Sequence, residues 1–367
     1  MLNADSVTAP VRRILSSVQF APQRGIAIAL SGGGDSTALL CLLHDFLSGC
    51  GEQNRLFAIT VDHGLRPESA EEAKRAGDFC AALGIPHEIR RWEGKKPGAG
   101  LQAAAREARY RLLAEAAEGA GCSLVMTGHT LDDQAETVAM RHVRGAGRGL
   151  SGVAPATLYE KRIWFVRPLI RQRRVDLRAY LASRGQDWID DPSNKDPRFE
   201  RVRMREAIGE DQLDPEAFRK AFEERSRQSE QAAAILEDDG AWLFDRDART
   251  AVSILDEATG REGFPLALAV VMGWVGHGAY LPTGAVLEKA VAFCSDASNG
   301  RKMTAAGCLL AKVQGRVTIG REARNTRSRG FGFDHLLPSP DHAVAEALAR
   351  RIRAAPWPPP PLSGYPD

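Results

Sequence analysis

The chain has 367 residues, of which 44% are hydrophobic and 26% charged, and its formal net charge is +2. This length exceeds one compact core of ordinary size, so we expect two or three domains. The N-terminus has no charged-then-apolar leader and the chain has no apolar run of membrane-spanning length, which argues against secretion and against a membrane partner.

The first 150 residues alternate apolar, strand-like runs with helical patterns. The predicted strands cover residues 26–30, 56–61, 87–90 and 124–127. The predicted helices between and after them cover residues 37–47, 68–83, 101–117 and 131–144. This alternation predicts βαβ units around a parallel sheet, and therefore an α/β nucleotide-binding domain.

The later part of the chain has a different pattern. Residues 206–295 are mostly helical, for instance at 215–236 and 265–275, whereas residues 301–320 predict short strands joined by a Gln-Gly turn. The tail ends in a proline-rich segment that we expect to be disordered. We therefore predict an N-terminal extension, a catalytic domain, a helical middle domain, a small α+β C-terminal domain and a tail, at residues 1–24, 25–205, 206–295, 296–330 and 331–367.

The segment IAIALSGGGDS at residues 26–36 is the clearest functional signal. A buried strand that ends in a glycine turn at a helix start directs unpaired backbone N–H groups, and the positive end of the helix dipole, at one spot. Ser31 and Ser36 add hydroxyl donors. Such a turn suits a phosphate, and the absence of a following lysine excludes a Walker A loop. A glycine turn that binds nothing is the structural alternative.

Three polar motifs follow predicted strands: SGGGDS at 31–36, VDHG at 61–64 and TGHT at 127–130. The carboxyl ends of parallel strands meet at one edge of a sheet, where ligands bind. We therefore expect one ATP site there, with the binding residues Ser31, Gly32, Gly33, Gly34, Asp35, Ser36, Asp62, His63, Gly128 and His129.

Three carboxylates open the helix after the fourth strand: Asp132, Asp133 and Glu136. Their spacing places Asp133 and Glu136, or Asp132 and Glu136, on one face. Acidic residues also favour a first helical turn for electrostatic reasons alone. Carboxylates beside phosphates repel them unless a cation lies between, so this cluster indicates Mg²⁺.

Other candidate residues are less specific. His129 suits a base, a phosphate ligand or a cap, and Arg106 and Arg109 lie one turn apart on the preceding helix, where a solvated face is the alternative to a site role. GRGLSG at 147–152 matches a dinucleotide fingerprint, but it follows a helix, so we reject that interpretation. Six scattered cysteines without a CxxC pair argue against zinc, an iron–sulfur cluster or a dithiol centre, and fit a reducing cytoplasm.

Charge is distributed in blocks along the chain. Residues 141–205 hold 16 Lys/Arg against 7 Asp/Glu, residues 206–300 hold 8 against 18, and residues 301–330 hold 8 against 1. The local balances are thus +9, −10 and +7. Two basic blocks that flank an acidic one favour a polyanionic partner.

The glycine loop resembles the SGGxDS loop of the PP-loop (N-type) ATP pyrophosphatases, which cleave between the α- and β-phosphates. Within that superfamily the chain is similar to the tRNA(Ile)-lysidine synthetase family from residue 25 to about 325. The motifs that carry this resemblance are VDHGLRPES, GHTLDDQAET, RPLIRQRRVDLRAYLASRGQDWIDDPSNKDPRFERVRMR and GRKMTAAGCLLAKVQGRVTIGREAR.

The resemblance implies a cytoplasmic, ATP- and Mg²⁺-dependent ligase that attaches free lysine to C2 of the wobble cytidine of a CAU-anticodon tRNA(Ile), through an adenylated cytidine. It also implies a PP-loop ATP-binding domain at 25–205 and a tRNA contact in the C-terminal domain. The catalytic residues that it implies are Asp35, Arg109, Asp133, Glu136, Arg201 and Arg205, with Asp35 and Asp133 as Mg²⁺ ligands. The choice among Arg201, Arg203 and Arg205 stays open.

Two departures and two rivals accompany this prediction. Thr130 follows His129 where the family often has paired histidines, and RGAGRGLSG is one residue shorter than the usual loop. A tRNA thiolase of the same superfamily is the nearest rival, although its chemistry generally uses cysteines. A non-catalytic tRNA- or nucleotide-binding protein is the other rival, and Asp35, Asp133 and Glu136 speak against it. The oligomeric state, a homodimer included, stays open.

Overall fold

The structure is a computed structural model. It describes residues 5–21, 23–94, 96–143, 151–190, 200–208, 214–254, 258–278, 280–296, 298–323, 332–362 and 364–366. The chain divides into two compact units: the first comprises residues 1–145, 155–219 and 361–367, and the second comprises residues 146–154 and 220–360.

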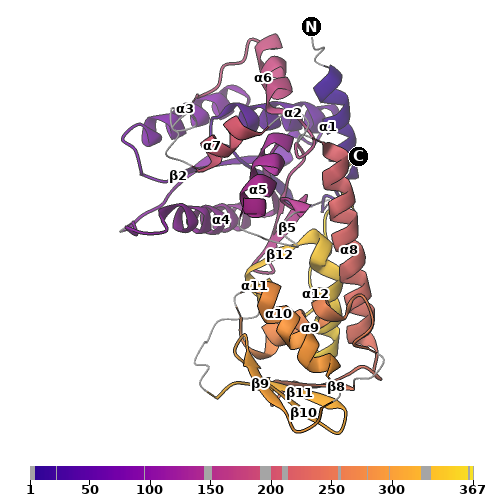
Figure 1. The fold of residues 1–367 in the computed structure, drawn as a ribbon. Coiled ribbons are helices and arrows are strands. Elements are labelled where there is room, and N and C mark those ends of the chain that lie inside the picture. The colour runs from indigo at the N-terminus through magenta and orange to yellow at the C-terminus, as the bar shows by residue number, and fades with distance from the viewer. Residues whose placement is uncertain are drawn as a thin grey trace. The chain divides into compact units, whose positions relative to one another are not determined.

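The first unit is built around a mostly parallel sheet (Figure 1). Its strands lie in the spatial order β5 (Ala156–Tyr159), β6 (Ile163–Val166), β4 (Cys122–Thr127), β1 (Gly25–Ala29), β2 (Leu56–Asp62) and β3 (His87–Arg91). All neighbours pair in parallel except β5, which runs antiparallel to β6. The predicted parallel α/β fold and its four strands are confirmed, whereas β5 and β6 are additional.

Strand β1 reads as a continuous apolar run because helices cover both faces of the sheet, so residues pointing either way are buried. Helices α2 and α3 lie on one side of the sheet and α4 on the other (Figure 1), as right-handed crossovers require. The helices of this unit are α1 (Asp5–Ser17), α2 (Gly34–Gly49), α3 (Ser69–Ala82), α4 (Leu101–Gly119), α5 (Leu131–Val143), α6 (Arg174–Ser183) and α7 (Glu200–Ala207), with a 3₁₀ turn at Gln53–Arg55.

The N-terminal extension forms α1, whose apolar residues recur at helical spacing. Val7, Val11 and Ile14 are buried, as is Val18 directly after the helix. The helix packs on α2 and α6. An amphipathic stripe of this width is what a surface helix needs to attach to a core. The extension is therefore an integral layer of the first unit.

The second unit contains an antiparallel sheet in the order β7 (Trp242–Asp245), β8 (Thr250–Ile254), β11 (Arg316–Arg321), β10 (Cys308–Val313) and β9 (Lys302–Ala305). Its other elements are α9 (Phe264–Val275), α10 (Gly284–Ser295), α11 (Gly332–His335), β12 (Leu336–Pro338), a 3₁₀ turn at Ser339–Asp341 and α12 (His342–Arg351). Helix α8 (Pro215–Glu237) begins in the first unit and ends in the second.

The Gln-Gly turn predicted within residues 301–320 joins β10 to β11. Gln314 and Gly315 have φ values of 51° and 72°, and they connect the paired residues Val313 and Arg316. Positive φ at both central positions belongs to a type I′ turn, whose twist matches that of antiparallel strands. The predicted short strands of this region are thereby confirmed.

The proline-rich tail, for which the sequence predicts disorder at its end, packs against the first unit. Leu362 and Tyr365 are buried, and the amide of Gln134 donates to the Tyr365 hydroxyl at 3.5 Å. Arg171 donates to the carbonyl of Pro366. Two apolar side chains among the prolines account for this docking. Within the described residues, no helix has both the length and the apolar character that crossing a membrane requires.

Candidate active site

The loop between β1 and α2 is shaped by its own hydroxyl groups. The Ser31 backbone N–H donates to Ser36 Oγ at 3.2 Å, and Ser36 Oγ donates to the carbonyl of Gly33 at 3.0 Å. Gly33 is the N-cap of α2, and no side chain caps this helix. The N–H groups of the first turn of α2 are therefore directed into the pocket described below, as expected of an anion-binding turn.

Two glycines let neighbouring segments approach this loop closely. Gly32 has φ +78°, and a Cβ there would lie 2.5 Å from Cδ1 of Ile189. A Cβ on Gly128 would lie 3.0 Å from the backbone of Asp35 and Ser36. A side chain at position 128 would crowd this backbone, so the TGHT motif after β4 lies directly against the first turn of α2, as the common sheet edge predicts.

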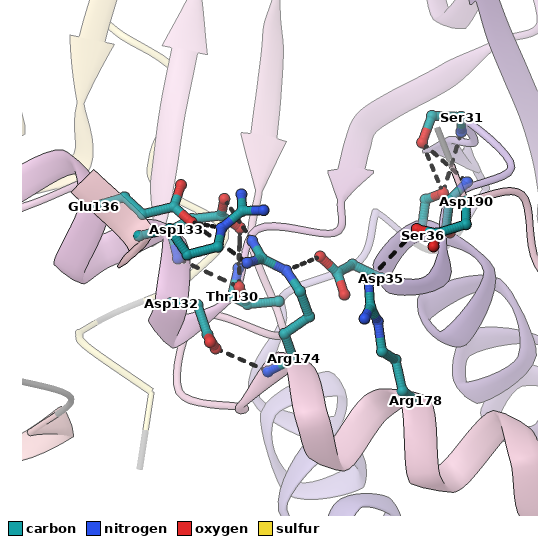
Figure 2. Close-up of polar contacts among 12 residues, drawn as sticks. Ser31, Asp35, Ser36, Thr130, Asp132, Asp133, Glu136, Arg174, Arg178 and Asp190 are labelled. Atoms are coloured by element: carbon teal, nitrogen blue, oxygen red, sulfur yellow. Dashed lines mark hydrogen bonds and ion pairs between the residues drawn. The ribbon is translucent and has the colours of Figure 1, made fainter. Parts of the chain in front are cut away.

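Helix α5 is capped by Thr130, the residue that replaces a second histidine. The Thr130 backbone N–H and hydroxyl both donate to Asp133 Oδ2 at 2.9 Å, and the Asp133 N–H lies 3.4 Å from Thr130 Oγ1. This is a capping box with an aspartate at its third position. Thr130 thus fixes one oxygen of Asp133, and the other oxygen, Oδ1, faces Arg174 (Figure 2).

Arg174, at the start of α6, joins the three acidic side chains of the site (Figure 2). Its Nε donates to Asp35 Oδ2 at 3.0 Å, its Nη2 to Asp133 Oδ1 at 3.2 Å and its Nη1 to Glu136 Oε1 at 3.3 Å. Its backbone N–H donates to Asp132 Oδ2 at 2.8 Å. Asp132 therefore holds the start of α6, while the guanidinium of Arg174 gathers the other three carboxylates.

Arg205 of α7 adds a second cation to this cluster. Its Nε donates to Glu136 Oε1 at 2.7 Å, and its side chain is 38% exposed, compared with 1% for Glu136. The structure thus places Arg205 in the site. The side chain of Arg201 and residues 191–199 lie outside the described residues, so the predicted motif there has no structural account.

These groups line one cavity of about 660 Å³ in the first unit. The predicted residues that line it are Ser31, Gly33, Gly34, Asp35, Ser36, His63, Arg109, Gly128, His129, Asp133, Glu136 and Arg205. Further residues that line it include Arg106, Arg174, Arg178 and Trp188. The size is that of a small-molecule site, with mostly polar and charged walls.

Two predicted ATP ligands do not line the cavity. Gly32, although part of the loop, packs against the side chain of Ile189. Asp62 accepts hydrogen bonds from the Gly64 N–H at 2.8 Å and from Ser69 Oγ at 2.6 Å. Burial acts to raise the pKa of Asp62, but these two hydrogen bonds together with the charge of Arg91 outweigh burial and lower the pKa. The structure thus places Asp62 as the organiser of the turn after β2, which carries His63 to the cavity.

Burial changes the protonation of several groups in the cavity. The pKa of His129 lies well below its ordinary value because the ring is buried and faces the Arg167 charge. The pKa of His63 is lowered by burial and by Arg109. Both rings are therefore neutral at physiological pH. Burial raises the pKa of Asp35 despite the attraction of Arg174.

A buried network supports the arginines of α4. The Tyr110 hydroxyl accepts from Arg106 Nη2 at 3.0 Å and from Arg167 Nη2 at 3.1 Å. Burial acts to raise the pKa of Tyr110, but the charges of Arg167 and Arg106 outweigh it and lower the pKa. This network fixes Arg106 at the cavity, where the sequence had left a solvated helix face as the alternative.

Sequence reasoning misses Arg174, the residue with most contacts to the acidic cluster. The sequence feature that includes Arg174 is the basic run RPLIRQRR, but nothing in that run distinguishes Arg174 from the neighbouring arginines. Of the aromatic residues Trp164, Trp188 and Phe199, Trp188 lines the cavity and Trp164 is buried in β6. Phe199 lies outside the described residues.

A glycine loop between β1 and α2, at the carboxyl edge of a parallel sheet and beside an acidic helix start, defines a nucleotide-binding protein of the PP-loop class. Residues 6–212 match the PP-loop domain family.

Similarity to curated proteins identifies one family within the PP-loop class. The chain is 41% identical over 321 residues to the tRNA(Ile)-lysidine synthase of Rhizobium meliloti (strain 1021), covering 83% of this chain and 69% of that protein. It is 52% identical over 202 residues to that of Mesorhizobium japonicum, covering 53% and 44%, and 44% identical over 222 residues to that of Brucella melitensis biotype 2, covering 58% and 48%. The last two matches span about half of each relative. The chain belongs to the tRNA(Ile)-lysidine synthase family.

Proposed function

We propose that this chain joins lysine to the wobble cytidine of a tRNA(Ile) with a CAU anticodon, using ATP. In the first step the cytosine O2 attacks the α-phosphorus, and the bond to the leaving pyrophosphate breaks. In the second step an amino group of lysine attacks C2, loses a proton, and AMP leaves with the original O2. The products are lysidine, AMP and pyrophosphate.

The observation that carries this proposal is the juxtaposition of the glycine loop and the acidic start of α5 in one cavity. The loop offers N–H donors for phosphate oxygens, and Ser31 and Ser36 line the same wall. On the opposite wall Asp133 and Glu136 offer carboxylates suited to an incoming ammonium group. A phosphate site and an amine site that face each other are what adenylation followed by amine attack requires.

The arginines around the cavity suit the charge that develops during the reaction. Arg106 and Arg109 line it from α4, and Arg205 lines it from α7. A guanidinium beside the α-phosphate stabilises negative charge in the transition state more than in the ground state. We assign this role to Arg109, and we assign to Arg205 the role of holding Glu136.

Asp35 and Asp133 are the proposed Mg²⁺ ligands. Asp35 Oδ1 is buried and has no hydrogen-bond partner, so one carboxylate oxygen in the site is available to a cation. Oxygen ligands that include one or two carboxylates and substrate phosphates are those that Mg²⁺ prefers. When bound, the ion neutralises phosphate charge and orients the α-phosphate for attack.

The rival chemistry of a tRNA thiolase has less support. All six cysteines are free, and among the described residues none lines the cavity. Burial raises the pKa of Cys41 to about 11 and of Cys80 to about 12, so neither thiol is a ready nucleophile. A protein that only binds tRNA or nucleotide has no need for carboxylates beside a phosphate site, so the non-catalytic alternative also has less support.

One assay separates the three functions. The full chain is incubated with ATP, radiolabelled lysine and a tRNA(Ile) transcript with a CAU anticodon, or the same transcript with uridine at the wobble position. We expect lysine incorporation that requires both ATP and the cytidine. Sulfur transfer instead of lysine transfer supports the thiolase, and tRNA binding without either reaction supports the non-catalytic protein.

A further inference from the structure

The acidic cluster of the site is held by one guanidinium that uses each nitrogen for a different carboxylate (Figure 2). The carboxylates come from two helices, Asp35 from α2 and Asp133 and Glu136 from α5. The Arg174 side chain is 15% exposed, so water screens these contacts only in part. Arg174 therefore has the place in this cluster that a shared cation would have.

We propose that Arg174 is a positioning residue that keeps free divalent cations out of the nucleotide-free site, so that the cation enters together with ATP. This inference rests on the proposed function. The guanidinium spaces the carboxylates around itself at hydrogen-bond distances of 3.0 to 3.3 Å. Mg²⁺ needs its oxygens at about 2.0–2.1 Å, which this spacing does not supply.

The carboxylates of this cluster do not converge on a common point in the structure. Within the described part of the chain, no three His, Cys, Asp or Glu side chains come close enough together to hold a metal ion. The acidic residues are present, but they are distributed around Arg174 instead of a common centre. A free divalent ion has to bind beside a fixed positive charge, and in a half-buried site that repulsion is strong.

Bound ATP makes the cavity attractive to a divalent cation, because its phosphates bring negative charge that outweighs the charge of Arg174. Asp35 has one buried oxygen, Oδ1, without a hydrogen bond, while Oδ2 stays on Arg174. A cation that is already bound to phosphates can use this oxygen without breaking the contact to the guanidinium. Arg174 then continues to hold the carboxylates in place during the reaction.

The chain offers a matched control one turn along α6. Arg178 also lines the cavity and carries the same charge. Its charge acts on Asp35, but its side chain lies 3.9 Å from Asp190 in an ion pair and is 47% exposed. Substitution of Arg178 thus removes a nearby positive charge and leaves the three-way contact intact.

The test measures Mn²⁺ binding to the full chain without nucleotide, with free Mn²⁺ followed by electron paramagnetic resonance. We expect Arg174→Gln to bind Mn²⁺ about tenfold more tightly than the wild type, and Arg178→Gln to change the affinity by less than about threefold. Circular dichroism verifies that each variant is folded. Equal or weaker Mn²⁺ binding by folded Arg174→Gln overturns the proposal.

Arg174→Lys keeps the charge and loses the three-way geometry, and it provides a second test if the glutamine variant does not fold. We expect its Mn²⁺ affinity to stay within about threefold of the wild type; tenfold tighter binding contradicts the role of charge. Adding a non-hydrolysable ATP analogue is expected to tighten Mn²⁺ binding more in the wild type than in Arg174→Gln. None of these measurements uses tRNA or lysine, so failure of the proposed function is seen separately, as absent lysine incorporation.

Discussion

Helices α5 and α9 both bury side chains, but they bury different kinds. In the first unit, α5 buries Gln134 and Glu136 beside its apolar residues, and its first turn faces a cavity. In the second unit, α9 is buried along nearly its whole length and contains no charged residue. Burying charge at α5 costs folding free energy, which the ion pairs of Glu136 with Arg174 and Arg205 offset. Helix α9 contributes stability through the burial of apolar side chains.

The largest effect is expected at α5. Asp133→Asn removes a carboxylate charge at nearly constant volume, and we expect turnover of lysine into tRNA to fall about 100- to 1000-fold. Binding of tRNA, measured by filter retention, is expected to stay within about threefold because phosphate contacts dominate it. Asp132→Asn is the control, since Asp132 does not line the cavity and accepts from the Arg174 backbone. Loss of tRNA binding with normal turnover contradicts the assignment.

The next effect concerns α9. Leu268 is fully buried, and Leu268→Ala is expected to lower the free energy of unfolding by about 2–5 kcal/mol, because it removes apolar contacts and leaves a cavity. Urea unfolding measures this loss. We expect the folded variant to bind ATP with wild-type affinity. If the variant has normal stability but fails to bind ATP, the proposal that α9 contributes to stability and α5 to the site is wrong.

A smaller effect is expected at the cap of α5. Thr130→Ala removes the hydroxyl that bonds Asp133, and we expect a loss of about 1 kcal/mol in the free energy of unfolding. Turnover is also expected to fall, because Asp133 Oδ2 keeps only one of its two bonds from residue 130. Thr130→Ser retains the hydroxyl and serves as the control. Identical behaviour of the two variants argues against the capping role.

The smallest effect is on pH dependence. The folded-state pKa of His129 is below the unfolded value of 6.5, so the unfolded chain takes up a proton first as the pH falls. The contribution of this residue to stability is therefore fully present well above pH 6.5 and is lost as the pH falls through that value, with a loss of less than about 1 kcal/mol by pH 6. Thermal unfolding between pH 7.5 and 5.5 measures the slope, and His129→Gln is expected to flatten it. An unchanged slope shows that His129 does not titrate as described.

Local sequence signals predict much of the first unit. Apolar runs such as 26–30 are long enough to identify buried parallel strands, and glycine with serine identifies the turn after β1. Because parallel strands end at one edge, His63 and Gly128 are predicted beside the loop, and the structure places both there. The strands β5 and β6 have four residues each. Such short segments do not show a recognisable alternation of apolar and polar residues.

The contacts between distant elements are what the sequence does not predict. Arg174 is one arginine in a basic run, and its importance depends on α2, α5 and α6 converging on the same point. Asp62 has the position of a ligand in its motif, yet its Oδ1 accepts two hydrogen bonds within the turn after β2. Side-chain partners of this kind follow from the fold and leave no pattern in the chain.

Cytidine-dependent pyrophosphate release tests the central claim most directly. The full chain is mixed with ATP and a tRNA(Ile) transcript that carries CAU, without lysine, and pyrophosphate and inorganic phosphate are measured separately. We expect pyrophosphate in an amount that follows the transcript, and none when the wobble cytidine is replaced by uridine. Release of inorganic phosphate, or of pyrophosphate regardless of the wobble base, contradicts adenylation of the cytidine in this cavity.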